Sequence, residues 1–164
     1  MAGKADFTAD EWSLLCRSPM LAALVVVAAS PSGPFGVLKE MIAVGKLVAE
    51  TKAKGGGDSL VGAVVGEITT REGIERAKPT DIQGMSPDQV RSHALDQLKQ
   101  VAALLRQKAP SDAGGFSQWL QEVGKRVANA SKEGGFLGIG GTLVSEQEQA
   151  ALRDTAEALG VQQA

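Results

Sequence analysis

The stretch MLAALVVVAAS, residues 20–30, is the longest apolar run in the chain. A helix over residues 19–29 is apolar on every side, and a helix of that kind belongs at the centre of a bundle. The run has about half the length that a helix needs to cross a bilayer, so we expect a core helix. A shallow membrane hairpin formed with residues 34–48 is the alternative.

The residues on either side of this run predict where helices begin and end. Thr8 and Glu11 match a capping box, in which each side chain accepts a hydrogen bond from the other residue's backbone N–H. A short helix is therefore expected to run to about Arg17. Ser18-Pro19 suits the N-cap and first position of a second helix, so we expect the chain to restart there. Residues 30–34, SPSGP, form a clear break.

The rest of the first half predicts two further helices, over residues 35–53 and 58–69. The first of them has three large apolar residues near one face, namely Leu38, Ile42 and Leu47. In the second, Gly62 and Gly66 are four residues apart, and this spacing predicts the close approach of another helix. Residues 70–85 are polar and irregular, so we expect a helical turn or two followed by a surface loop.

The second half shows clear helical periodicity. Ser86 and Ser145 each open a capping box, and Pro110 ends the long helix that precedes it near Lys108. Apolar residues then recur at intervals of three and four, which is one face of a helix. The predicted inner faces are Val90, Ala94, Leu98, Val101 and Leu105 on one helix, Phe116, Leu120, Val123 and Val127 on the next, and Leu152, Thr155, Ala156 and Leu159 on the last.

No segment alternates apolar and polar residues with a period of two, so the sequence predicts an all-α fold. We expect residues 1–164 to form a single domain, a bundle of about six or seven helices with residues 19–29 buried at its centre. The two halves, residues 1–69 and 86–164, are joined by the polar loop 70–85.

A weak internal similarity suggests a repeat. Residues 28–40, AASPSGPFGVLKE, and residues 128–141, ANASKEGGFLGIGG, both run from a helix through a glycine-bracketed Phe. The two stretches are consistent with helical hairpins that pack about a pseudo-two-fold axis.

The stretch GGFLGIGG, residues 134–141, is the most unusual in the chain. Five glycines, Gly134, Gly135, Gly138, Gly140 and Gly141, surround Phe136, Leu137 and Ile139. A phosphate loop would need a lysine where Gly141 stands, and a membrane-inserting segment would need more flanking cations. Ordering the glycines costs roughly 0.5–1 kcal/mol each, whereas burying each large side chain returns roughly 1.5–3 kcal/mol. We therefore expect a structural loop that packs against an end of the bundle.

The chain offers little converging chemistry. His93 is the only histidine and Cys16 the only cysteine. A lone histidine has no histidine partner for a metal site, and we expect His93 at a helix boundary and Cys16 as a small buried hydrophobe. The acidic residues stand mainly at helix starts, where the helix dipole favours them. We predict no cofactor, no metal site and no enzymatic activity.

Composition restricts the partners and the compartment. The formal net charge of −2 gives no basic field for a phosphate backbone, so we expect no nucleic-acid partner. A single cysteine favours a reducing compartment, and the first residues lack the apolar stretch of a signal peptide. We therefore expect a cytoplasmic protein.

The last helix carries a short motif. It opens with S-x-x-E and closes with Leu-Gly, at Ser145, Glu148, Leu159 and Gly160. With the glycine-containing loop before it, the stretch from Phe116 to Val161 resembles the tellurite-resistance TerB group of bacterial all-α proteins. The resemblance covers about a quarter of the chain and implies a compact bacterial helical bundle. That group carries an Asp-Gly loop implicated in metal binding, but residues 140–142 are Gly-Gly-Thr here, so no metal site is transferred.

These features together favour a soluble helical protein that acts by binding another protein or itself. The basis is the abundance of small-residue helix faces and the scarcity of converging polar groups. The alternative is a carrier of an apolar ligand, or a protein bound peripherally to a membrane.

Overall fold

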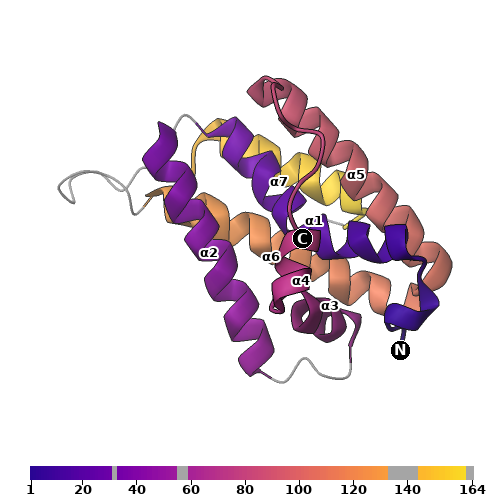
Figure 1. Cartoon of the computed structure of the whole chain (residues 1–164). Coiled ribbons are helices and arrows are strands. Elements are labelled where there is room, and N and C mark those ends of the chain that lie inside the picture. The colour runs from indigo at the N-terminus through magenta and orange to yellow at the C-terminus, as the bar shows by residue number, and fades with distance from the viewer. Residues whose placement is uncertain (31–32, 55–58, 133–143, 162–164) are drawn as a thin grey trace.

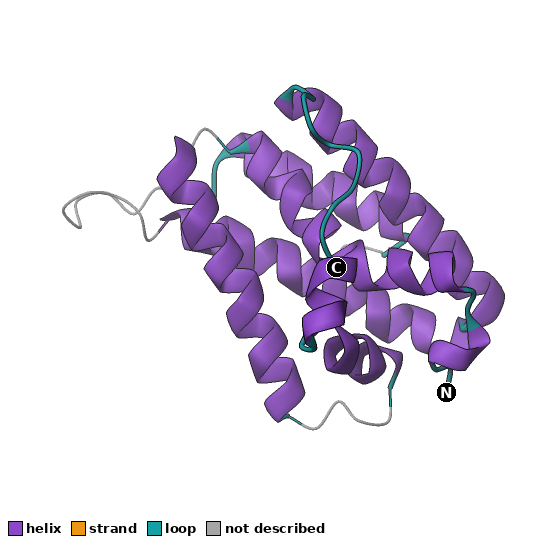
Figure 2. Ribbon diagram, viewed as in Figure 1, coloured by secondary structure: helices purple, strands orange, loops and turns teal. Residues whose placement is uncertain are grey.

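Helices make up almost all of the regular structure (Figure 2). The computed structural model describes residues 1–30, 33–54, 59–132 and 144–161, without the side chains of residues 33–40 and 131–132. The helices are α1 (Ala9–Ala29), α2 (Gly33–Ala53), α3 (Leu60–Ile68), α4 (Arg71–Arg76), α5 (Pro87–Lys108), α6 (Pro110–Lys132) and α7 (Glu146–Leu159), preceded by a 3-10 turn at Lys4–Asp6. Among the described residues 81% are helical and none forms a strand, which confirms the all-α fold.

Helix α1 lies at the centre of the molecule. It packs against α5, α6 and α7 from the second half and also against α2 (Figure 1). In Figure 1, α2 and α5 lie at opposite edges with α1, α6 and α7 between them. The buried residues of α1 are Trp12, Leu15, Cys16, Ser18, Pro19, Leu21, Ala22, Ala23, Val25 and Val26. The predicted central apolar helix is thus confirmed.

Helix α1 continues through Ser18 and Pro19, so the expected restart of the chain at this point is wrong. Proline has no N–H to donate to the carbonyl four residues earlier, here that of Leu15. The hydroxyl of Ser18 donates to that carbonyl instead, at 2.7 Å in a buried position. The side chain before the proline therefore replaces the missing backbone hydrogen bond.

Replacing Ser18 by alanine is expected to lower the free energy of unfolding by about 1–3 kcal/mol, because the buried Leu15 carbonyl loses its donor. In a Pro19→Ala background the restored backbone N–H serves the carbonyl, so Ser18→Ala should then cost less than about 1 kcal/mol. Urea unfolding of the four proteins in a double-mutant cycle measures the difference. Equal costs in both backgrounds would contradict this account.

Helix α1 is longer than the apolar run from which its length was predicted. Over Ala9–Ala29 it is long and apolar enough to cross a membrane by length and composition, with a mean hydropathy of 1.7 in its 18-residue window. Of that window, 56% is buried inside the molecule. The apolar run at residues 20–30 is therefore part of a longer helix than its sequence boundaries suggested.

The predicted helix ends are confirmed at several positions. Thr8, Ser86 and Ser145 each form a complete capping box. Gly160 ends α7 in the left-handed conformation, with φ 68°, as a C-terminal glycine commonly does. Helix α6 begins at Pro110, so only Ala109 separates it from α5. Pro110 thus ends one helix and begins the next.

The predicted inner faces agree with the structure in most positions. All four of the α6 residues are buried, and so are the α5 residues except Val90 and the α7 residues except Leu152, both of which are partly buried. On α2, Leu47 is buried but Ile42 is 51% exposed, so that predicted face is only partly correct. The side chain of Leu38 lies outside the described part of the chain.

The corner between α3 and α4 leaves no room for a side chain at Gly73. A Cβ on Gly73 would lie 1.8 Å from the carbonyl oxygen of Glu67. Gly66, by contrast, is exposed, and a Cβ there would meet nothing within 4 Å. The expected close approach at Gly66 is therefore wrong. The two turns of α4, followed by a loop, match the expectation for residues 70–85.

Two predictions concern residues that the structure does not describe. Phe136, Leu137 and Ile139, with their five surrounding glycines, lie within residues 133–143. The second stretch of the suggested repeat also ends there. The packed loop and the pseudo-two-fold repeat both stay predictions.

Candidate functional site

A shallow polar depression of about 580 Å³ lies beside His93, between the start of α1, the α4–α5 connection and α5. We call it the acidic groove. Its chemically active lining residues are four carboxylates, one guanidinium and one imidazole, from Asp10, Glu11, Asp81, Asp96, Arg17 and His93. The sequence singled out His93 but gave no sign that residues 80–81 lie near it.

Two contacts hold the sides of the acidic groove in place. Arg17 on α1 donates to the hydroxyl of Thr80 at 2.8 Å, which fixes the α4–α5 connection against α1. Asp81 follows directly in the left-handed region, with φ 63°, a conformation that Asp tolerates better than most residues. This turn is what brings the Asp81 carboxylate to the groove.

Glu11 lines the acidic groove, but its carboxylate already has hydrogen-bond partners within the protein. Its carboxylate accepts from the Lys108 ammonium at 2.6 Å and from the Thr8 backbone N–H at 2.7 Å. These hydrogen bonds, that of Lys108 first, lower the pKa of Glu11. Glu11 therefore ties α1 to the end of α5 and is a structural member of the lining.

His93 is half-buried, and its Nε2 lies 2.7 Å from the side-chain nitrogen of Gln97, one turn further along α5. None of the contacts of the described residues joins the imidazole to a carboxylate or a nucleophile. In the same part of the chain no three His, Cys, Asp or Glu side chains are grouped to hold a metal ion.

Cys16 is fully buried, as the sequence predicted, and does not line the acidic groove. Burial, with a further contribution from Glu67, raises the pKa of its thiol to about 12. The nucleophilic form of cysteine is the thiolate, which is scarce at neutral pH under these conditions. Cys16 contributes packing to α1.

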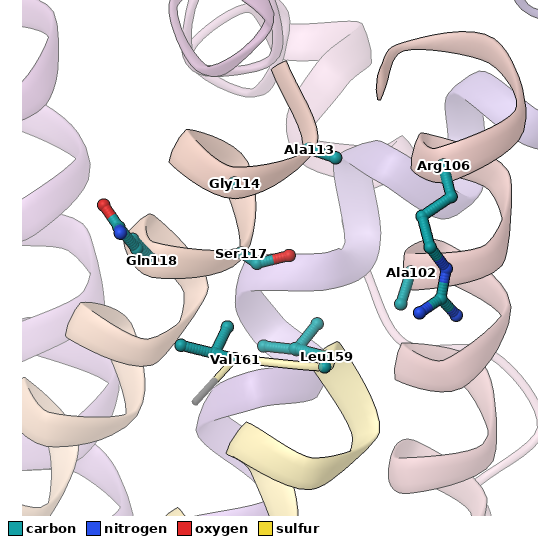
Figure 3. Close-up of a pocket in the computed structure, with 9 residues that line it drawn as sticks. Ala102, Arg106, Ala113, Gly114, Ser117, Gln118, Leu159 and Val161 are labelled. Carbon is teal, nitrogen blue, oxygen red and sulfur yellow. The ribbon is translucent and has the colours of Figure 1, made fainter. Parts of the chain in front are cut away.

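A second hollow, of about 370 Å³, lies where α5, α6 and α7 meet (Figure 3). We call it the Arg106 pocket. Ala102 and Arg106 of α5, Ala113, Gly114, Ser117 and Gln118 of α6, and Leu159, Gly160 and Val161 at the end of α7 line it. Sequence reasoning did not identify this pocket. Its one signal is Ser117, a polar residue that directly follows Phe116, the first residue of the predicted inner face.

The comparisons with known proteins add no evidence on the family or the function of this chain. The chain matches no protein-family model, and no curated protein or solved structure resembles it closely enough to count as a relative. The cap at Ser145 and the stop at Gly160 are real, but any capped amphipathic helix has them. The resemblance to the TerB group therefore stays a prediction.

Proposed function

We propose that the protein is a non-enzymatic binding protein that holds a basic segment of a partner protein in the acidic groove. The observation that carries this proposal is the excess of carboxylates in the groove. Asp10, Asp81 and Asp96 are exposed there, and the guanidinium of Arg17 is directed to Thr80. A lysine or arginine side chain of a partner is the complementary group.

Two of these carboxylates are free to bind a cation. Among the described residues, the side chains of Asp10 and Asp81 have no hydrogen-bond or ion-pair partner. Asp96 has only an exposed contact with Lys99 at 3.3 Å. The groove is open to solvent and not enclosed, which suits an extended peptide better than a small molecule.

The double variant Asp10→Asn/Asp81→Asn is expected to bind a short lysine-rich fluorescent peptide roughly fivefold more weakly. Each exposed ion pair contributes about 0.5 kcal/mol, and two of them give about 1 kcal/mol. Fluorescence anisotropy at low salt measures the affinity. The wild-type affinity should fall as salt is added, because these charges are exposed.

The matched control is Glu72→Gln/Glu157→Gln, which removes the same two charges from exposed positions outside the groove. This control should bind the peptide nearly as well as the wild type. A peptide in which glutamine replaces lysine should not bind. If both double variants bind alike, or if the wild type does not bind the lysine peptide, the proposal is wrong.

A further inference from the structure

The Arg106 pocket differs from the acidic groove in its charge, because the residues that line it include one cation and no carboxylate. Its volume of about 370 Å³ falls within the range of roughly 300–1,000 Å³ typical of small-molecule sites. Three helices contribute to it: the end of α5, the first turns of α6 and the end of α7. Figure 3 shows the side chain of Arg106 descending from α5 on one side and Ser117 facing it from α6.

Arg106 supplies a positive charge without a matching carboxylate. Among the described residues its guanidinium takes part in no ion pair. It reaches across to the end of α7, where its Nη1 would lie 3.3 Å from a Cβ built on Gly160. Arg106 is exposed, and the C-terminal carbonyls of α7 favour a cation at this position.

Ser117 supplies a second, independent indication. The residue is only 5% exposed, and within the described structure its hydroxyl has no hydrogen-bond partner. The oxygen itself is not fully buried and stays accessible from the pocket, where no protein group pairs with it. In Figure 3 the Ser117 oxygen points toward the side of the pocket where Arg106 lies. Oxygens of a ligand in the pocket would meet a cation on the α5 side and a hydroxyl on the α6 side.

The apolar residues that line the pocket indicate the chemistry of the uncharged part of the ligand. Ala102, Ala113, Leu159 and Val161 present only carbon on their side chains. One guanidinium beside the negative end of a helix matches a single negative charge better than a doubly charged phosphate. We propose that the Arg106 pocket binds a short-chain monocarboxylic acid, with its carboxylate on Arg106 and Ser117 and its alkyl chain against the four apolar residues.

Hexanoate is a suitable probe, and isothermal titration calorimetry on the whole protein gives its affinity. We expect a dissociation constant on the order of 1 mM, the affinity range of a ligand with few atoms. Hexanamide, which has the same shape without the charge, should bind at least about tenfold more weakly. Equal binding of hexanamide or of inorganic phosphate would overturn the proposed carboxylate selectivity, and absence of hexanoate binding would overturn the site.

Variants separate ligand binding from folding. Arg106→Gln should weaken hexanoate binding at least about tenfold, whereas Arg71→Gln, the same change on exposed α4, should leave it unchanged. Ser117→Ala should weaken binding about three- to fivefold without lowering the Tm of the empty protein, because this hydroxyl makes no hydrogen bond within the described structure. A lowered Tm with unchanged hexanoate affinity would show that Ser117 is structural and would contradict its assigned role.

Discussion

Phe116→Ala is expected to lower the free energy of unfolding by about 3–5 kcal/mol, the largest effect among the substitutions considered. Phe116 lies on α6 with no exposed surface. Its ring meets the Trp119 ring edge-on, with centroids 5.5 Å apart and an interplanar angle of 70°. Alanine loses both the buried area and this contact, and leaves a cavity lined by side chains that are already packed.

Urea unfolding followed by circular dichroism measures this loss, and Phe116→Leu is the control. Leucine keeps most of the volume, so we expect a loss of only about 1–2 kcal/mol. Trp119 is a local fluorescence probe of this substitution, because its ring contacts Phe116. In the wild type its side chain is 8% exposed, and its ring N–H donates to the Thr51 hydroxyl at 3.3 Å. Its emission should shift to longer wavelength in Phe116→Ala. A loss of stability no larger than that of Phe116→Leu would mean that the site is loosely packed.

Gly73→Ala is expected to cost about 3 kcal/mol, although it adds a single methyl group. The added Cβ would lie 1.8 Å from the oxygen and 2.4 Å from the carbon of the Glu67 carbonyl. That oxygen already accepts from the backbone N–H and the hydroxyl of Thr70, at 2.9 and 2.8 Å. The backbone can make room only by separating α4 from the end of α3, which breaks these hydrogen bonds.

Gly66→Ala is the matched control, in the last turn of α3. Because a Cβ at Gly66 meets nothing within 4 Å and the residue is exposed, alanine should raise the free energy of unfolding by about 0.5–1 kcal/mol. The two glycine substitutions should therefore change the Tm in opposite directions. A Gly73→Ala protein as stable as the wild type would show that the α3–α4 corner adjusts freely.

Much of the fold could be predicted because its signals are local. The capping box of Thr8 and Glu11 depends on residues three apart, and the buried face of α6 on residues three and four apart. Such patterns are set by helical geometry and need no knowledge of distant segments. The end of α7 at Gly160 follows from the same kind of reasoning, since glycine adopts a positive φ without strain.

The errors at Pro19 and Gly66 have a different origin. A proline after a serine suggests a new helix start, but packing of α1 on its neighbours favours a continuous helix once Ser18 supplies the missing donor. A pair of glycines four apart suggests a crowded face, yet the crowded glycine is Gly73, seven positions later. In both cases tertiary contacts decide between local alternatives.

Neither hollow could be predicted, since each depends on residues far apart in the chain. Arg17 and Thr80 are 63 positions apart, and their hydrogen bond fixes the connection whose turn brings Asp81 to the acidic groove. Arg106 and Ser117 come from two helices and Gly160 caps a third, and none of them alone indicates a pocket. His93 is the only histidine in the sequence, but its uniqueness does not predict which residues surround it.

The central position of α1 has a consequence for the synthesis of the chain. Helix α1 leaves the ribosome before α5, α6 and α7, the helices that cover most of it. At typical rates of translation the interval is roughly ten seconds, during which its valines and leucines have no native neighbours. The nascent chain therefore exposes the apolar surface of α1 early and buries it only late in synthesis. We expect chaperones that bind unfolded chains to engage this protein during translation.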